Sequence, residues 1–251
     1  MGRRFFVLII MIVILSAACS GGEKSQTTLT ISVAASLSAP MEELEKLYGN
    51  QHPDVEISFN FGGSGTLQQQ ISKGAPADLF ISAASDKFQL LTDEGKIDEQ
   101  NKTVLLGNSL VLVVPAEGEE VSISSLDQVG RISIGTPDSV PAGRYAEEAL
   151  RSMDILKDVE NNIVYAKDVK QVLSYVETGN VAAGIVYRTD ALVSDEVEIV
   201  HEFPAVSHTT IEYPAGVLKE APNYEAAVEF YEFLQTDAAL KVFESYGFTI
   251  K

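Results

Sequence analysis

Short runs rich in β-branched and aromatic residues alternate with amphipathic stretches along most of the chain. Residues 28–34 alternate apolar and polar side chains with a period of two, which is typical of a half-buried strand. After Pro40, the residues Met41, Leu44 and Tyr48 recur at the spacing of one helical face, and proline is favoured in the first turn of a helix. By the same patterns we expect a strand at 55–61, a turn at 62–65, helices at 66–73 and 86–94, a strand at 78–83, and one long apolar strand at 104–114 that Pro115 ends.

The second half of the chain repeats this order with different residues. Pro141 opens a predicted helix that runs to about Met153, and Asp168 is placed to cap a helix over 169–178. Further strands are predicted at 131–135, 162–165, 181–187, 197–203 and 210–218, and two closing helices at 224–235 and 237–246. This alternation is typical of βαβ units on a largely parallel sheet, and the number of elements favours two α/β lobes over one.

The N-terminus carries a targeting signal. A short basic segment precedes an apolar run of 14 residues from Phe5 to Ala18, which is shorter than the roughly 20 residues of a membrane span. We therefore predict a signal peptide over 1–18, and a lipidated Cys19 with a polar linker over 19–27. The sequence around Cys19 resembles the lipobox of bacterial lipoproteins, although Ser16 stands where leucine is usual. An ordinary secretory signal is the alternative, and either signal places the mature chain outside the cytoplasm.

The charge of the chain excludes several classes of protein. The sequence has 36 acidic and 18 basic residues, a formal net charge of -18, and removal of Arg3 and Arg4 with the signal leaves about -20. Nucleic-acid binding is not expected, since a phosphate backbone is normally met by clustered Lys and Arg. The single cysteine excludes an internal disulfide or a cysteine zinc cluster.

Residues typical of catalysis are sparse. The segment Gly62-Gly63-Ser64-Gly65-Thr66 lacks the second glycine of a G-x-S-x-G nucleophile elbow, and it is not followed by the Gly-Lys-Ser/Thr of a phosphate-binding loop. The three histidines show no metal-ligand spacing. We therefore expect a binding protein rather than an enzyme, with no cofactor.

Four predicted strands are each followed by a small or hydroxylic residue and then a helix. The first turn of a helix leaves backbone N–H groups unpaired and carries the positive end of the helix dipole, so each turn is a candidate anion site. In open α/β sheets such turns lie at the carboxyl ends of the strands, where ligands bind. Ser and Thr also cap helices in every kind of protein, so a purely structural role is the alternative for any one turn. The four turns are Ala34-Ala35-Ser36-Leu37, Gly63-Ser64-Gly65-Thr66, Val140-Pro141-Ala142-Gly143 and Lys167-Asp168-Val169.

Several of these turns, with other motifs, resemble the molybdate-binding proteins of bacterial ABC importers. The resemblance runs from about Thr28 to Lys251 and rests on the order and spacing of six segments. It implies a type II periplasmic-binding-protein fold, in which two α/β lobes enclose a ligand cleft. Lobe one would comprise 28–108 and 213–251, and lobe two 109–212. The segments are Ala34-Ala35-Ser36-Leu37, residues 74–83 (GAPADLFISA), Leu106-Gly107-Asn108-Ser109-Leu110, Val140-Pro141-Ala142-Gly143, Gly184-Ile185-Val186-Tyr187 and residues 246–251 (YGFTIK).

The resemblance also implies a set of ligand-binding residues. Ser36 and Ser64 would bind the oxyanion with hydroxyl and backbone N–H groups, Ala142 and Val169 with backbone N–H groups, and Tyr187 with its phenol. Molybdenum would thus be bound only as its oxyanion, through these five residues. The glycines on either side of Ser64 depart from the family, which often has further serines there, and we expect them to make this loop more flexible. Four basic residues close to these positions are expected to lie in solvent or behind the site: Arg144, Lys167, Lys170 and Arg188.

The function implied is capture of molybdate, with tungstate as a second ligand, and delivery to the membrane permease subunits of an ABC importer. The protein would be a monomer held on the outer face of the cell membrane by its lipid anchor. Three alternatives stay open at this point: a protein of the same fold for sulfate, phosphate or another small anion, an enzyme that uses Ser64, and an adhesive lipoprotein without a small ligand.

Overall fold

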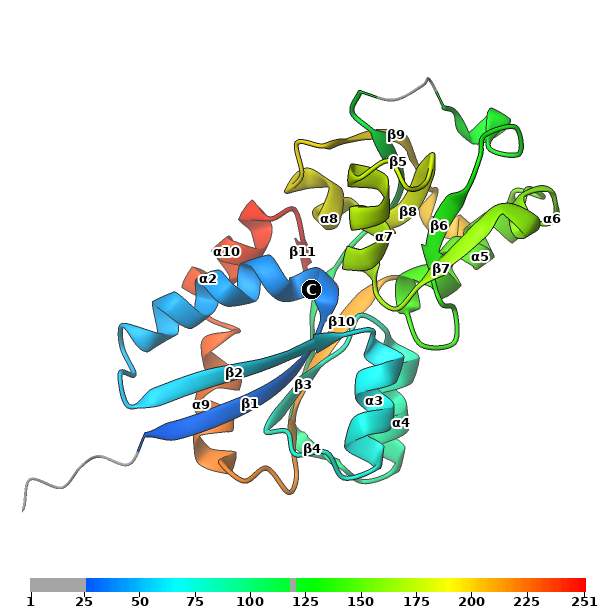
Figure 1. Ribbon diagram of the computed structural model, residues 1–251. Helices are drawn as coiled ribbons and strands as arrows, with labels where there is room; N and C mark the ends of the chain where they lie inside the picture. The colour runs from blue at the N-terminus through cyan, green and yellow to red at the C-terminus, as the bar shows by residue number, and fades with distance from the viewer. Residues whose placement is uncertain (1–25, 118–120) are drawn as a thin grey trace, which may run out of the picture.

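A computed structural model describes residues 26–117 and 121–251. Two α/β lobes, each built on its own sheet, lie end to end in Figure 1. The predicted signal peptide over 1–18, Cys19 and most of the predicted linker lie outside the described residues.

The first lobe is built on a six-stranded sheet with the order β11-β4-β10-β3-β1-β2. Strands β1, β2 and β3 are parallel to one another, whereas β10 is antiparallel to β3 and β4, and β11 is antiparallel to β4. The strands are β1 (Thr27–Ala34), β2 (Val55–Gly62), β3 (Leu79–Ile81), β4 (Ile97–Gly107), β10 (Glu212–Leu218) and β11 (Thr249–Ile250). The helices are α2 (Ser38–Gly49), α3 (Ser64–Ser72), α4 (Ser85–Asp93), α9 (Tyr224–Phe233) and α10 (Asp237–Ser245), with a short 3-10 helix η1 (Ala35–Leu37) before α2.

The second lobe is built on a five-stranded sheet with the order β7-β6-β8-β5-β9. Strand β6 is parallel to β7 and β8, and β5 is antiparallel to β8 and β9. The strands are β5 (Leu110–Pro115), β6 (Ile132–Gly135), β7 (Ile163–Ala166), β8 (Ala183–Tyr187) and β9 (Val197–Glu202). The α-helices are α5 (Pro141–Ser152), α6 (Leu156–Val159), α7 (Val169–Glu177) and α8 (Arg188–Leu192), and the 3-10 helices are η2 (Ile123–Ser125), η3 (Glu160–Asn162) and η4 (Ala205–Ser207).

The long apolar strand predicted over 104–114 is wrong, because the chain crosses between the two sheets inside it. Strand β4 ends at Gly107 and pairs with β10 in the first sheet, and β5 begins at Leu110 and pairs with β8 in the second. Between them, the side-chain Oδ1 of Asn108 accepts a hydrogen bond from the backbone N–H of Ser109 at 2.9 Å. Apolar periodicity alone does not mark this break, since the apolar residues on both sides are buried.

Two further expectations need correction. The sheets are mixed rather than largely parallel, since crossing strands and the return strand β10 run antiparallel to their neighbours. Helix α3 begins at Ser64 instead of after a four-residue turn, so Ser64 is the first residue of a helix. The mixed α/β fold class itself is as predicted, whereas the exact lobe boundaries at 108/109 and 212/213 stay a prediction.

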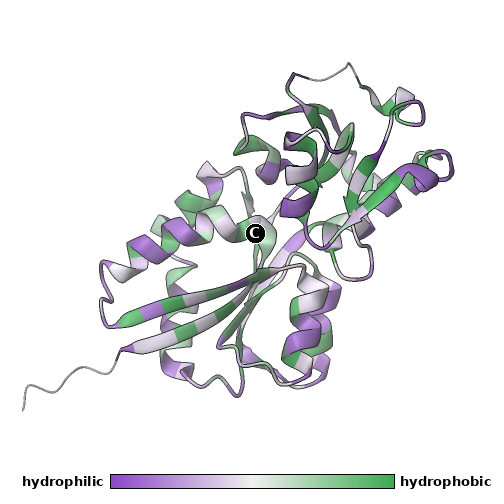
Figure 2. Cartoon of the chain, viewed as in Figure 1, coloured by the Kyte–Doolittle hydropathy of each residue, from purple (hydrophilic) through white to green (hydrophobic). Residues whose placement is uncertain are grey.

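Apolar side chains on the strands form the cores of the lobes. Leu29, Ile31 and Val33 of β1 and Ile185 of β8 are fully buried, and apolar residues follow the central strands of both lobes in Figure 2. Within residues 26–117 and 121–251, no helix has the length and apolar character that crossing a bilayer would need.

Candidate anion-binding site

The carboxyl ends of strands from both sheets meet at one small pocket between the lobes. All five residues expected to bind the ligand lie in its lining, and they come from four strand-to-helix turns and from the end of β8. The structure thus brings together residues separated by up to 151 positions in the chain, which is the spacing of Ser36 and Tyr187. The lining consists of Ala34, Ala35, Ser36, Gly62, Gly63, Ser64, Ala83, Val140, Pro141, Ala142, Asp168, Val169 and Tyr187.

Three helices of nine residues or more begin at this pocket. Ser64 is the first residue of α3, Ala142 the second of α5 and Val169 the first of α7. No carbonyl of the same helix can accept a hydrogen bond from these first-turn N–H groups. The three helix dipoles also place partial positive charge at the pocket. The site can therefore offer several backbone donors to an anion.

Local sequence features fix where two of these helices begin. Proline at the first position of α5 presets the backbone angle and lacks the N–H that would otherwise be unpaired. Asp168 caps α7, as expected, because its Oδ1 accepts the backbone N–H of Gln171 at 2.8 Å. Gly143 lets α5 approach β6 closely, since a Cβ there would lie 1.9 Å from the carbonyl oxygen of Gly135.

The two site serines are held by hydrogen bonds within the first lobe. Ser64 is fully buried, and its Oγ accepts the backbone N–H of Ala83 at 2.9 Å. Because this contact occupies an oxygen lone pair and not the proton, the Ser64 hydroxyl proton stays available to a ligand. The Oγ of Ser36 lies 3.1 Å from the phenol oxygen of Tyr213.

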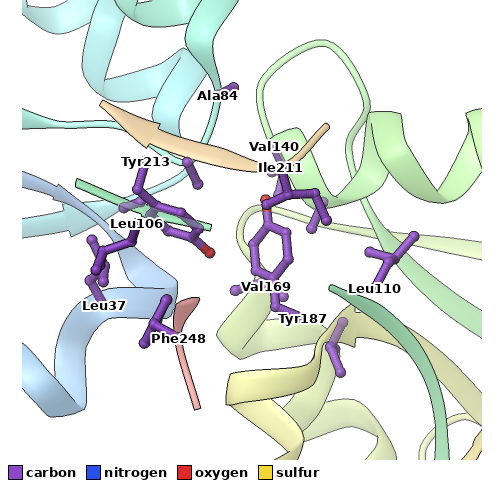
Figure 3. Packing of buried hydrophobic residues seen from close by; sticks show 14 of the residues in the cluster. Leu37, Ala84, Leu106, Leu110, Val140, Val169, Tyr187, Ile211, Tyr213 and Phe248 are labelled. Atoms are coloured by element: carbon purple, nitrogen blue, oxygen red, sulfur yellow. The ribbon is translucent and has the colours of Figure 1, made fainter. Parts of the chain in front are cut away.

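Tyr187 contributes a buried phenol that lacks a partner. Its side chain is 1% exposed, and its hydroxyl has no hydrogen-bond partner in the part of the chain that the structure describes. Figure 3 shows the phenol between the lobes, beside Val140 and Ile211. Burial raises the pKa of Tyr187 well above its usual value, so the hydroxyl keeps its proton and can donate. Buried polar groups are nearly always paired, so an unpaired hydroxyl at a pocket indicates a missing acceptor.

The lobes are in direct contact around the pocket, so the structure is a closed form. The backbone N–H of Gly65 in the first lobe donates to the carbonyl oxygen of Ser139 in the second at 2.9 Å. The phenol of Tyr145 on α5 donates to the carbonyl oxygen of Ala83 at 3.3 Å. The pocket between the lobes has a cavity volume of about 10 Å³, close to the space that one water molecule needs.

The glycines around Ser64 have a different role from the one expected. Neither has a positive φ angle, and both lie where the lobes meet. A Cβ on Gly63 would lie 2.8 Å from the carbonyl oxygen of Ser139, and one on Gly65 would lie 2.8 Å from the Cα of Ser139. These glycines therefore allow close approach of the second lobe, a role that the sequence pattern did not indicate.

Charged side chains surround the pocket without entering it, apart from Asp168. Arg144 on α5 pairs with Asp86 on α4 of the other lobe, with 2.5 Å between Nη1 and Oδ2. Lys170 on α7 lies 3.6 Å from Oδ1 of Asp190, whose side chain is fully buried. Burial raises the pKa of Asp190 to about 7, although Lys170 opposes this. Among the described residues, no group of His, Cys, Asp or Glu side chains could hold a metal ion.

Sequence reasoning missed two residues behind the site: Tyr213, which contacts Ser36 and Tyr187, and Asn108, which contacts Tyr213. Tyr213 lies on β10, and Asn108 lies where the chain crosses between the lobes. Asn108 Nδ2 donates to the phenol oxygen of Tyr213 at 3.1 Å and to Oγ1 of Thr189 at 2.8 Å. The polar pair Asn108-Ser109 between two apolar runs was the available signal for the crossing. No local pattern marks Tyr213, because its partner Ser36 is 177 residues away.

The fold and the enclosed pocket define a class of two-lobed binding proteins. The structure resembles the periplasmic molybdate-binding protein of Azotobacter vinelandii with a TM-score of 0.79 at 21% identity, covering 89% of this chain and 99% of that one. The fold is therefore that of the periplasmic binding proteins.

Sequence comparison places the chain more narrowly. The family model described as bacterial extracellular solute-binding protein matches residues 29–249. YvgL of Bacillus subtilis, provisionally named an ABC transporter substrate-binding lipoprotein, is 52% identical over 238 residues, which cover 92% of each chain. The molybdate-binding protein ModA of Haemophilus influenzae is 37% identical over 230 residues, covering 89% of this chain and 90% of its own. The chain belongs to the bacterial extracellular solute-binding protein family, so it is the solute-binding protein of an ABC transporter and not an enzyme.

Proposed function

We propose that this protein captures molybdate, and tungstate as a second ligand, and delivers it to the permease subunits of an ABC importer. The observation that carries the proposal is the buried Tyr187 hydroxyl, which lacks an acceptor at a pocket where three helices begin. The similarity to molybdate-binding proteins supports the choice of ligand. Ser36, Ser64, Ala142, Val169 and Tyr187 would bind the oxyanion.

The lining suits an anion that carries no protons. A fully deprotonated tetrahedral dianion can only accept hydrogen bonds, and the proposed contacts are N–H and O–H donors. Donors that the closed lobes hold in place can satisfy its oxygens, while helix dipoles offset part of its charge. This chemistry explains how a chain with a formal net charge of -18 can bind an anion without a Lys or Arg in the pocket lining.

The size of the cavity restricts the ligand further. A cavity of about 10 Å³ favours a small ligand over an organic molecule. We expect a tetrahedral inorganic anion to be enclosed with the contact between Gly65 and Ser139 retained. The permease would then recognise the closed, loaded protein, which acts as a monomer whose two lobes, 28–108 with 213–251 and 109–212, move as units.

Sulfate, phosphate and other small anions are the alternative ligands. Hydrogen phosphate would bury an O–H group, at a cost of about 1 to 3 kcal/mol if that proton finds no acceptor. Sulfate is fully deprotonated, so only its smaller size distinguishes it from molybdate. We therefore expect sulfate to be the stronger of these two competitors.

A thermal-unfolding panel tests the ligand. A ligand present at a hundred times its Kd stabilises a protein by about 2.7 kcal/mol, which gives a clear rise in the unfolding midpoint. Molybdate and tungstate should raise the midpoint at micromolar concentrations, sulfate only at far higher ones, and phosphate not at all. Equal responses to sulfate or phosphate and to molybdate would overturn the proposed ligand, and no response to any anion would overturn the proposed site.

We also propose that Cys19 is lipidated and anchors the mature protein to the outer face of the membrane. The similar protein YvgL is named a lipoprotein, and two acyl chains on one cysteine suffice for stable anchoring. Wild-type protein should fractionate with membranes, and Cys19→Ser should release it. A soluble wild-type protein whose mature chain begins at another residue would contradict this proposal.

A further inference from the structure

A chain of hydrogen bonds runs from the crossing between the lobes to one of the proposed ligand donors. The side-chain amide of Asn108 donates from Nδ2 to the phenol oxygen of Tyr213 at 3.1 Å. That phenol oxygen lies 3.1 Å from Oγ of Ser36. Tyr213 is fully buried and Ser36 is 4% exposed, so water does not compete for these contacts.

The side-chain amide of Asn108 fixes which atom donates in each of these hydrogen bonds. An amide nitrogen can only donate, so the phenol oxygen of Tyr213 accepts from Asn108. The Tyr213 proton is then free to be donated to Ser36, and burial raises the pKa of Tyr213, which keeps that proton in place. With its oxygen accepting from Tyr213, Ser36 has its own proton left for the pocket that it lines.

We propose that Asn108 and Tyr213 are positioning residues that make Ser36 a hydrogen-bond donor toward the bound oxyanion. The inference rests on the proposed function, because it concerns the same site. Neither residue lines the pocket. Each acts through Ser36. Without Asn108 the Ser36 proton can turn to Tyr213, and without the Tyr213 hydroxyl no contact holds the Ser36 hydroxyl in the orientation that donates to the ligand.

Other contacts hold Asn108 in the orientation that this direction requires. Its Oδ1 accepts the backbone N–H of Ser109 at 2.9 Å, which fixes which end of the amide is the nitrogen. Its Nδ2 also donates to Oγ1 of Thr189, which is 3% exposed and lies two residues after Tyr187. The amide thus contacts both lobes at the point where the chain crosses between them.

A double-mutant cycle between Tyr213 and Ser36 tests the proposal. Calorimetric titration with molybdate would compare wild type, Tyr213→Phe, Ser36→Ala and the double variant. Phenylalanine keeps the ring contacts with Tyr187 and Phe248, so the fold should be retained. We expect Tyr213→Phe to weaken binding about three- to thirtyfold in wild type and to have no further effect when Ser36 is already alanine.

Tyr48→Phe is the matched control, since Tyr48 is also a buried tyrosine of the first lobe, and its hydroxyl has no partner among the described residues. It should bind molybdate as wild type does. Independent, additive losses from Tyr213→Phe and Ser36→Ala would show that Tyr213 only packs, and would overturn the inference. Failure of wild type to bind any tetrahedral oxyanion would instead refute the proposed function.

Reversing the donor–acceptor direction of these hydrogen bonds is a second test. Asn108→Asp replaces the donor with an acceptor, so the Tyr213 proton would turn to the carboxylate and the Ser36 proton would turn to Tyr213. The negative charge that this substitution adds weakens anion binding by itself, and this loss of affinity is also present in the Ser36→Ala background. We expect Asn108→Asp to cost at least threefold more affinity in wild type than in Ser36→Ala. Equal losses in both backgrounds would contradict the proposed direction.

Discussion

Replacing Gly65 with alanine should impair closure of the lobes and leave the open form, in which the lobes are apart, unchanged. The backbone N–H of Gly65 donates to the carbonyl oxygen of Ser139 across the lobes at 2.9 Å. A Cβ at this position would lie 2.8 Å from the Cα and 2.9 Å from the oxygen of Ser139, and 3.1 Å from the oxygen of Asp138. All three are backbone atoms of the other lobe, so no side-chain rotation can relieve the overlap.

The size of the effect follows from these distances. Ordinary contacts of a Cβ begin at about 3.4 Å, so the lobes must separate by several tenths of an ångström or deform. Overpacking of this kind typically costs about 1 to 3 kcal/mol. Because the cost falls only on the closed form, it should appear as affinity weaker by about five- to 150-fold, with each 1.4 kcal/mol equal to a factor of ten.

Calorimetric titration with molybdate would measure this loss, with small-angle scattering of the ligand-saturated protein as a measure of closure. Gly49→Ala is the matched control, because a Cβ on Gly49 meets no atom within 4 Å. The unfolding midpoint of ligand-free Gly65→Ala should be at or slightly above that of wild type, since alanine favours a helix over glycine. Wild-type affinity in Gly65→Ala would refute the idea that the lobes meet at this residue when the ligand is bound.

Three other substitutions test separate parts of the site. Tyr187→Phe should weaken molybdate binding about ten- to a hundredfold in calorimetry, the range for a lost hydrogen bond to a charged partner, with little change in ligand-free stability; equal affinity would make Tyr187 a core aromatic. Asp86→Asn breaks the half-exposed ion pair with Arg144 across the lobes and should weaken molybdate binding up to about fivefold, with a smaller effect in high salt. The control Glu147→Gln affects an ion pair inside α5 and should leave molybdate binding unchanged. Burial raises the pKa of Asp190 from 3.8 to about 7, so the folded state holds this proton more tightly than the unfolded state, and the resulting stability is lost as pH rises from about 4 through 7. Denaturant unfolding should therefore show Asp190→Asn losing less stability than wild type between pH 5 and pH 8, by about 2 to 3 kcal/mol, the range that this pKa rise allows over that interval. Identical pH profiles would contradict this expectation.

The positions of the turns could be predicted from sequence because their signals are local. Pro141 and Asp168 mark helix starts within one or two residues, and each follows a short strand. The carboxyl ends of parallel strands share one edge of a sheet, so such turns converge without any knowledge of tertiary packing. Four of the five candidate site residues lie in these turns and could be placed together in this way, whereas Tyr187 was implied only by the resemblance to molybdate-binding proteins. The role of all five in binding stays a prediction.

Features that depend on contacts between distant segments could not be predicted in the same way. The first half of β4, residues 97–103, is mostly polar and is held as a strand by its pairing with β10, more than 100 residues later. The close approach of Gly65 to Ser139 and the contact of Tyr213 with Ser36 likewise join segments that no periodicity relates. The packing of one segment on another accounts for both Gly65, which we had related to flexibility, and Tyr213, which no motif marks.

Asp168 shows how the lining can contain a carboxylate and still favour an anion without protons. It is the one acidic residue of the lining, so it is the one carboxylate there that could accept the proton of hydrogen phosphate. Its Oδ1, however, caps α7 through the N–H of Gln171, and α7 is the helix whose first residue, Val169, would donate to the ligand. Turning the capping oxygen toward a protonated ligand would remove that cap, at a cost of about 0.5 to 2 kcal/mol, and using the other oxygen would bring a negative charge closer to the anion. The cap that orients one donor therefore also occupies one oxygen of the only carboxylate in the lining, which links the local stability of α7 to the rejection of protonated anions.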